Sequence, residues 1–177
     1  MSDTKLTHIM VDLETLGTRP GSAIFSIGAI KFRDNKIIGD FLGNPSLESN
    51  IRQGLTFDPH TIRWWMAQDD KARSQFENAN GDLKDVLKDF STWAGPAKNL
   101  AMWGCGSDFD NALLAEAYKR CEMEVPWNFW NGRCYRTIKE MFPDVEPTFV
   151  GVKHNAMDDA LSQAHHLIKI FKTHGFS

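Results

Sequence analysis

Cysteine is scarce in this chain, with three among 177 residues, and the three do not form a recognisable pattern. Cys105, Cys121 and Cys134 lie 16 and 13 positions apart, whereas disulfide frameworks need an even number and zinc sites need close pairs. We therefore expect reduced thiols in a cytoplasmic protein. The N-terminal segment also lacks a long apolar run, which argues against a signal peptide and against a membrane span.

An excess of positive charge is missing too. The chain has 20 Lys and Arg residues against 23 Asp and Glu residues, so its formal net charge is −3. This balance excludes a strongly basic protein that coats nucleic acid non-specifically. It leaves open a nucleic-acid enzyme whose acidic side chains gather around metal ions.

Several catalytic motifs are absent as well. The chain has no His-Glu-x-x-His pair, no Walker phosphate loop and no Gly-x-Ser-x-Gly nucleophile elbow. Gly104-x-Gly106 lacks the third glycine of a dinucleotide-binding loop. These absences argue against zinc proteases, P-loop enzymes, serine hydrolases and dinucleotide-binding enzymes.

The composition is that of a globular protein, with 42% hydrophobic and 24% charged residues. The length corresponds to about 1.2 domains of typical size, so we expect residues 1–177 to form a single domain. Chains of this size bury roughly 68–70% of their unfolded surface, and they need no disulfide or structural metal to fold.

Strands are expected in the N-terminal part. A short apolar run over residues 8–11 ends at the acidic segment 12–14, which indicates a central strand covered on both faces. Two β-rich runs follow at residues 23–32 and 36–41, and the segment 33–35 between them suits a tight hairpin. The opening therefore predicts a three-stranded meander.

Helices and shorter strands alternate in the rest of the chain. The expected elements are a helix from Asp58-Pro59, helices over 67–79 and 83–93, a strand over 99–103, a helix over 108–121, a fifth strand over 127–130, a helix over 133–142 and a final helix after Asn155. Together they predict an α/β fold with a mixed five-stranded sheet flanked by helices.

Two pairs of acids stand beside expected strands. Asp12 and Glu14 are two apart on a strand, so their side chains leave the same face with a rise of roughly 6.6 Å. They are either solvated charges or ligands at a sheet edge where ligands gather. Asp108 and Asp110 follow the strand that ends at Trp103. One acid of this pair, which we take to be Asp108, is expected to cap the next helix.

A third cluster begins the last helix. Asn155 is a good N-cap, and this places Asp158 at the third helical position, as in a weakened capping box. Asp159 is then available for another role. His154 precedes the cap on a loop, where an imidazole titrates near neutral pH, although a lone histidine is more often structural.

Electrostatics decides what such acids can do if the fold brings them together. Four carboxylates about 6 Å apart at an effective dielectric of about 20 repel by about 2.8 kcal/mol per pair, or about 17 kcal/mol over six pairs before screening. Such a cluster either takes up protons or binds divalent cations, and oxygen ligands favour Mg²⁺ or Mn²⁺ over zinc. Two such ions assist in-line displacement at phosphorus, and a nearby histidine is a suitable general base.

Five segments in this order resemble the DEDDh exonuclease family, which has a ribonuclease H-like fold. They are Asp12-Leu13-Glu14-Thr15-Leu16-Gly17-Thr18-Arg19-Pro20-Gly21, Trp64-Trp65-x-x-Gln68, Trp103-Gly104-x-Gly106-x-x-Phe109-Asp110, Arg133-Cys134-Tyr135-Arg136-Thr137 and His154-Asn155-Ala156-x-Asp158-Asp159-Ala160. The resemblance covers nearly the whole chain and is to the subgroup with phage exonuclease A and mycobacterial exoribonuclease-like proteins.

The resemblance implies a metal-dependent 3′-to-5′ exonuclease that releases nucleoside 5′-monophosphates from single-stranded ends, with RNA favoured over DNA. It implies that four acids hold two Mg²⁺ or Mn²⁺ ions and that one histidine deprotonates the attacking water. These residues are Asp12, Glu14, Asp110 and Asp159 for the ions and His154 for the proton.

The substrate-binding residues are also expectations from this resemblance. Thr15 and Leu16 are expected to hold the terminal nucleotide, with the apolar side chain wedged against its base, and Phe109 to lie beside them. Relatives often have Asn where this chain has Cys105, which bears on substrate preference. Adjacent helical residues point in different directions, so one of Trp64 and Trp65 packs in the core; we assign base stacking to Trp64, although the sequence does not decide between them.

Two other functions use the same residues. A non-catalytic subunit that only grips 3′ ends would be expected to lose an acid or the histidine, and this chain retains all five. A phosphodiesterase acting on dinucleotides has the same chemistry with a shorter groove. Relatives also pair as homodimers, so a dimer is a further expectation. Arg136 and Lys153 are candidate phosphate contacts, although isolated basic residues are usually only solvated.

Overall fold

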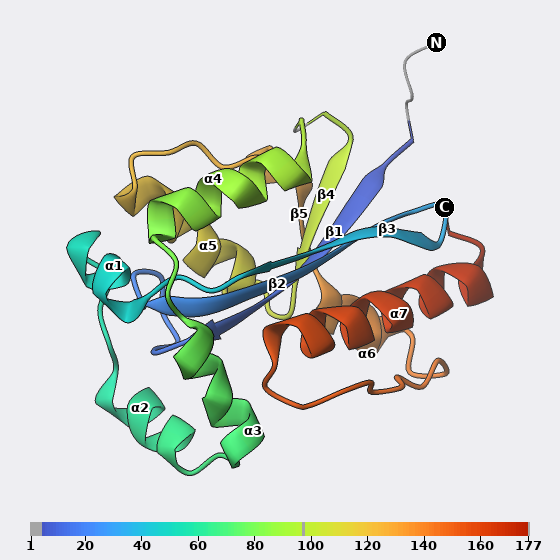
Figure 1. Ribbon diagram of the computed structural model, residues 1–177. Helices are drawn as coiled ribbons and strands as arrows, with labels where there is room; N and C mark the ends of the chain where they lie inside the picture. The colour runs from blue at the N-terminus through green and yellow to red at the C-terminus, as the bar shows by residue number, and fades with distance from the viewer. Residues whose placement is uncertain (1–4, 97, 177) are drawn as a thin grey trace.

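The computed structural model describes residues 5–96 and 98–176, and its strands form one sheet in the order β3-β2-β1-β4-β5 (Figure 1). The strands are β1 Thr7–Thr15, β2 Ile24–Arg33, β3 Lys36–Gly43, β4 Leu100–Gly104 and β5 Gly132–Cys134. β1, β2 and β3 pair antiparallel, whereas β4 pairs parallel with β1 and β5 parallel with β4. The predicted meander and the mixed five-stranded α/β sheet are confirmed.

Helices cover both faces of this sheet, α4 and α5 on one and α6 and α7 on the other (Figure 1). The α-helices are α1 Leu47–Arg52, α2 Pro59–Met66, α3 Asp70–Arg73, α4 Leu83–Ala94, α5 Asp110–Arg120, α6 Tyr135–Met141 and α7 Ala156–His174. Short 3₁₀ helices occupy Ser74–Asn78 and Phe129–Asn131. None of the helices formed by the described residues is both long and apolar enough to cross a membrane.

β1 is buried between the two helical layers. Ile9 and Leu13 belong to the core cluster shared with α4 and α5, whereas Met10 belongs to the cluster shared with α6 and α7. Side chains alternate along a strand, so Asp12 and Glu14 project on the same face as Met10, toward α7. The strand thus carries both carboxylates on one face near its C-terminal end.

The first turn of α7 packs directly on the backbone of β2. Gly28 of β2 pairs with Asp12 of β1. A Cβ atom on Gly28 would lie only 2.2 Å from the carbonyl carbon and oxygen of Ala156. Only glycine permits this close approach, and it brings the start of α7 beside Asp12.

The predicted fifth strand at residues 127–130 is wrong. Trp127 is buried against Tyr118, with ring centroids 6.1 Å apart, and the next residues form a 3₁₀ helix with Phe129 and Trp130 exposed. The strand that pairs with β4 is β5, two residues later. Aromatic residues therefore mark a core anchor here, and pairing with β4 determines where the strand forms.

Two predicted helices have different bounds. The segment 67–79 contains only the short α3 and a 3₁₀ helix, because Asp69 caps a new helix inside it by accepting from the Ala72 N–H at 2.9 Å. α5 begins at Asp110, with Phe109 as the N-cap residue and no side-chain capping bond. The capping role predicted for Asp108 is therefore wrong.

Candidate active site

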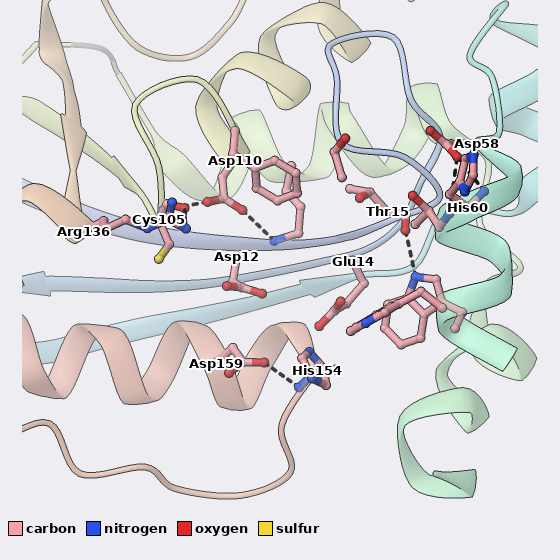
Figure 2. Close-up of a pocket in the computed structure, with 16 residues that line it drawn as sticks. Asp12, Glu14, Thr15, Asp58, His60, Cys105, Asp110, Arg136, His154 and Asp159 are labelled. Atoms are coloured by element: carbon pink, nitrogen blue, oxygen red, sulfur yellow. Dashed lines mark hydrogen bonds between the residues drawn. The ribbon is translucent and has the colours of Figure 1, made fainter. Parts of the chain in front are cut away.

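Three acids from two elements meet on the α7 face of the sheet. Carboxylate oxygens of Asp12, Glu14 and Asp159 all lie within 4.8 Å of one another. Asp12 and Glu14 come from β1, and Asp159 comes from the first turn of α7 (Figure 2). The structure therefore brings together residues that are separated by about 145 positions in the sequence.

Asp110 adds a fourth carboxyl group from the other side of β1. It is buried, its Oδ1 accepts from the Leu13 N–H at 3.1 Å, and its Oδ2 accepts from the Cys105 N–H at 2.6 Å. These bonds tie the start of α5 to β1 and to the turn after β4. Asp110 is close enough that its charge raises the pKa of both Asp12 and Glu14.

The cluster is strongly biased against full ionisation. Burial, together with the charges of Asp159 and Asp110, raises the pKa of Glu14 to about 8. Burial and the neighbouring carboxylates also raise the pKa of Asp12, and burial raises that of Asp110 to about 6 against the opposing effect of its backbone hydrogen bonds. Metal-free carboxyls at this density hold protons because their charged forms repel one another.

The same residues fit divalent cations. Glu14 Oε1 is buried and has no hydrogen-bond partner among the described residues, so it is an acceptor without a donor. A group of closely spaced carboxylate oxygens is the donor set that Mg²⁺ and Mn²⁺ prefer. A cation would satisfy the unpartnered oxygen and offset the repulsion at once.

His154 lies at the edge of this cluster in a constrained conformation (Figure 2). Its φ of 62° is left-handed, which costs energy for any residue other than glycine. The surrounding contacts hold the backbone in this conformation. The backbone N–H of His154 donates to Asp159 Oδ2 at 2.8 Å, and its backbone carbonyl accepts from the Gln75 side chain. Its ring meets Trp64 edge to face at 4.9 Å.

Asp158 has a different role from the one predicted. Asn155 is the N-cap of α7, as expected, since its Oδ1 accepts from the Met157 and Asp158 N–H groups at 3.2 Å. Asp158 does not close a capping box; its Oδ2 accepts from the Val152 N–H at 2.8 Å. It therefore fastens the loop before His154.

Trp64 and Trp65 point in different directions, as helix geometry requires of adjacent residues. Trp65 is buried, and its Nε1 donates to the Thr15 carbonyl at 2.9 Å. Trp64 is 44% exposed and faces the cavity beside His154. The structure thus places Trp64 at the mouth of the site and Trp65 behind it.

Thr15 lies in the cavity wall, whereas Leu16 does not. Leu16 is buried at 3% exposure in the core cluster, because its backbone pairs with Ala23 and Asp58 and turns the side chain inward. It is absent from the residues that line the cavity. The base-wedging role expected of Leu16 is therefore wrong. The apolar residues that line the cavity include the partly buried Phe109 and the exposed Trp64, together with Leu13 and Trp65.

The cavity encloses about 750 Å³. Every expected catalytic residue lines it, namely Asp12, Glu14, Asp110, His154 and Asp159. It also contains Arg136, a candidate phosphate contact, and four side chains that were not expected, those of Thr18, Asp58, His60 and Thr61. The four unexpected residues lie on a loop and a helix whose approach to β1 leaves no local sequence signal.

Gln163 is a further residue that the sequence analysis missed. Its Nε2 donates to Asp12 Oδ1 at 2.7 Å, and it stands one helical turn after Asp159 on α7. Residues four apart lie on one face of a helix, so this spacing was the available signal. The bond orients the Asp12 carboxylate within the cluster.

Residues 7–171 match the family described as the 3′-5′ exoribonuclease Rv2179c-like domain. The chain belongs to this family. The description of this family as a 3′-5′ exoribonuclease domain agrees with the exonuclease resemblance expected from the sequence. No curated protein sequence matches the chain.

Solved structures show the same ribonuclease H-like fold as this exonuclease domain. The nuclease domain of 3′hExo, a DEDDh family member with bound rAMP, has a TM-score of 0.64 at 15% identity, covering 98% of this chain and 95% of that one. S. pombe Pop2p in its Mg²⁺ and Mn²⁺ bound form has a TM-score of 0.63 at 15% identity, covering 93% and 82%.

E. coli exonuclease I in complex with a 5cy-dT13 oligonucleotide has a TM-score of 0.67 at 14% identity, covering 96% of this chain. This chain spans only 41% of that exonuclease I chain. At these identities the comparisons establish the shared fold.

Proposed function

We propose that this domain removes nucleotides one at a time from the 3′ end of single-stranded RNA, and of DNA less well, with two Mg²⁺ or Mn²⁺ ions. The observation that supports this most directly is the buried cluster of Asp12, Glu14, Asp110 and Asp159 beside His154. One buried carboxylate oxygen of this cluster has no hydrogen-bond donor, and a bound cation would compensate for the cost of burying it.

The residues divide the chemistry among themselves. Asp12, Glu14 and Asp159 would hold the ions, with Asp110 completing the set. Bound divalent cations supply the positive charge that stabilises the phosphorane-like transition state and the leaving oxygen. An imidazole nitrogen of His154 takes the proton of the attacking water, and Trp64 limits the motion of the ring.

The cavity shape suits a strand end. α2 lies across one end of the cavity, where its residue His60 is labelled (Figure 2). Trp64 of the same helix also lines the cavity. An exposed indole stacks on bases of any sequence, a contact worth about 1–3 kcal/mol in single-strand binders. The terminal nucleoside would therefore lie between Trp64 and Thr15, with its phosphate at the carboxylates.

The test is degradation of 5′-labelled single-stranded RNA and DNA in Mg²⁺ or Mn²⁺. We expect stepwise shortening that EDTA abolishes. Asp12→Asn should lower the rate by more than about a hundredfold, because replacing even outer-shell partners of metal ligands costs 10–100-fold.

Asp108→Asn is the matched control for this loss, because Asp108 is exposed and lies outside the cavity. It should leave the rate unchanged. A folded wild-type protein that degrades no strand would leave the non-catalytic 3′-end-binding subunit as the better interpretation. Cleavage of dinucleotides alone would favour the dinucleotide phosphodiesterase.

Two further expectations stay predictions. The cytoplasmic location rests on the three cysteines, which are all free in the structure. The homodimer rests on the resemblance alone, and no contact described here supports it.

A further inference from the structure

The cavity is uneven in charge. Five carboxyl groups line it, those of Asp12, Glu14, Asp58, Asp110 and Asp159. Among the described residues that line it, Arg136 is the one with a permanent positive charge. An arginine at the rim of so acidic a cavity needs a physical explanation.

Arg136 is held loosely and is open to solvent. It stands in the first turn of α6, is exposed, and donates from Nη2 to the Cys105 carbonyl at 3.3 Å, a long hydrogen bond. None of the ion pairs found among the described residues involves it. Most of its five N–H donors are therefore available for an anion.

The turn beside Arg136 does not depend on this bond. The Cys105 N–H is already fixed by Asp110 Oδ2 at 2.6 Å. Against the rise caused by burial, the Arg136 charge lowers the pKa of Asp110, so the guanidinium offsets part of the negative charge of the cluster, and its exposed N–H groups can bind an anion as well.

The cavity has two chemically different ends (Figure 2). Asp58, His60 and Thr15 lie at the end crossed by α2, and Arg136 and Cys105 lie at the opposite end. The carboxylates of Asp12 and Asp110 lie between the two ends. A strand that ends against α2 and follows the cavity past the carboxylates reaches the side of Arg136.

We propose that Arg136 binds the phosphate on the 5′ side of the penultimate nucleotide, one nucleotide step upstream of the bond that is cut. This assignment rests on the proposed function, because it assumes that the scissile phosphate lies at the carboxylates. A guanidinium suits the role because its planar fork contacts two phosphate oxygens at once and stays charged.

The assignment predicts that the shortest substrates differ in how fast they are cleaved, according to whether they carry a phosphate at the Arg136 position. A dinucleotide with a 5′-phosphate, pApA, fills the Arg136 position, whereas ApA leaves it vacant. A trinucleotide, ApApA, places its own internal phosphate there, so a further 5′-phosphate on it gains nothing. The 5′-phosphate effect should therefore appear at two nucleotides and disappear at three.

The experiment measures kcat/KM for the loss of each intact substrate, ApA, pApA, ApApA and pApApA, because pApA yields two AMP per cleavage and ApA yields one. We expect wild-type protein to prefer pApA over ApA by roughly ten- to a hundredfold, the range for a charged hydrogen bond. Arg136→Gln should abolish this preference, so that the variant cleaves pApA and ApA with similar kcat/KM. Arg136→Lys should recover part of the preference, because lysine keeps the charge and loses the fork.

Lys139→Gln is the matched control, since Lys139 is exposed on the same helix and does not line the cavity. It should retain the full preference. Thermal unfolding of each variant checks that the fold is intact.

Two results would overturn the assignment. Wild-type protein could cleave ApA as well as pApA, or Arg136→Gln could slow both equally, which would place the guanidinium on the scissile phosphate or in a structural role. If the wild type cleaves neither these short substrates nor any longer strand, the proposed function fails instead. Equilibrium binding of pApA and ApA to wild type and Arg136→Gln then still decides whether the phosphate site exists.

Discussion

Adjacent residues at the start of α7 have separate roles. Asp159 points its carboxylate into the acidic cluster, and Asp158 accepts from the Val152 N–H in the loop before His154. One position of helical rotation, about 100°, separates a side chain in the site from one that only supports the loop.

This separation predicts opposite effects of two substitutions. Asp159→Asn should abolish strand degradation with little loss of stability, because the amide oxygen still accepts from His154 and one repelling charge is gone. Asp158→Ala should cost about 1 kcal/mol of unfolding free energy and keep most activity, since it leaves one backbone N–H without its partner. Urea unfolding and the labelled-strand assay measure both; the reverse pattern would mean that Asp158 is the ligand.

His154 shows what residue-level analysis of a sequence can and cannot reach. Its type and position before an N-cap predicted an imidazole on a loop. The structure holds it at a φ of 62° through Asp159, Gln75 and Trp64. Gln75 is 79 positions away, so this restraint exists only in the folded chain.

At the level of elements, the site depends on how closely α7 approaches the sheet. Gly28 on β2 lies against the Ala156 carbonyl, and Asp12 lies beside Gly28 on β1. The distance from Asp12 to Asp159 is therefore determined by a glycine that carries no chemistry itself.

Gly28→Ala should move the start of α7 outward and separate these carboxylates. We expect a loss of about 1–3 kcal/mol from overpacking and a marked fall in activity. Gly39→Ala on β3 is the control, because a Cβ there meets only Trp93 Nε1 at 3.5 Å, an ordinary contact. Denaturant unfolding and AMP release compare the two, and equal activity in both variants would contradict the dependence on helix approach.

For the molecule as a whole, stability depends on a histidine far from the site. His8 is buried, stacks on Phe32 with centroids 4.8 Å apart, and accepts from Trp103 Nε1 at 3.0 Å. Burial, with a smaller effect of the Arg133 charge, lowers its pKa from 6.5 to about 4. The unfolded chain therefore takes up this proton first.

The His8 contribution to the free energy of unfolding, at most about 3 kcal/mol, should be fully present above pH 6.5 and be lost as the pH drops to about 4. In the metal-free protein the raised pKa values of Glu14 and Asp110 act in the opposite direction, so the His8 contribution is measured as a difference from a His8 variant. His8→Phe keeps the stacking and removes the proton site, so its free energy of unfolding should rise relative to that of the wild type as the pH falls from 6.5 to about 4. Exposed His165→Gln should behave like the wild type. Urea unfolding at several pH values tests this, and parallel curves for wild type and His8→Phe would contradict it.

The sequence by itself determined the sheet meander, the five catalytic candidates and the family, because alternation, acid spacing and motif order are local properties of the chain. Only the tertiary structure decided that Leu16 turns into the core, that β5 forms after the aromatic residues, and that Gln163 and Arg136 join the site. Those outcomes depend on which backbones pair and how closely helices approach the sheet. Such long-range packing is a property of the folded molecule, and no short stretch of sequence encodes it.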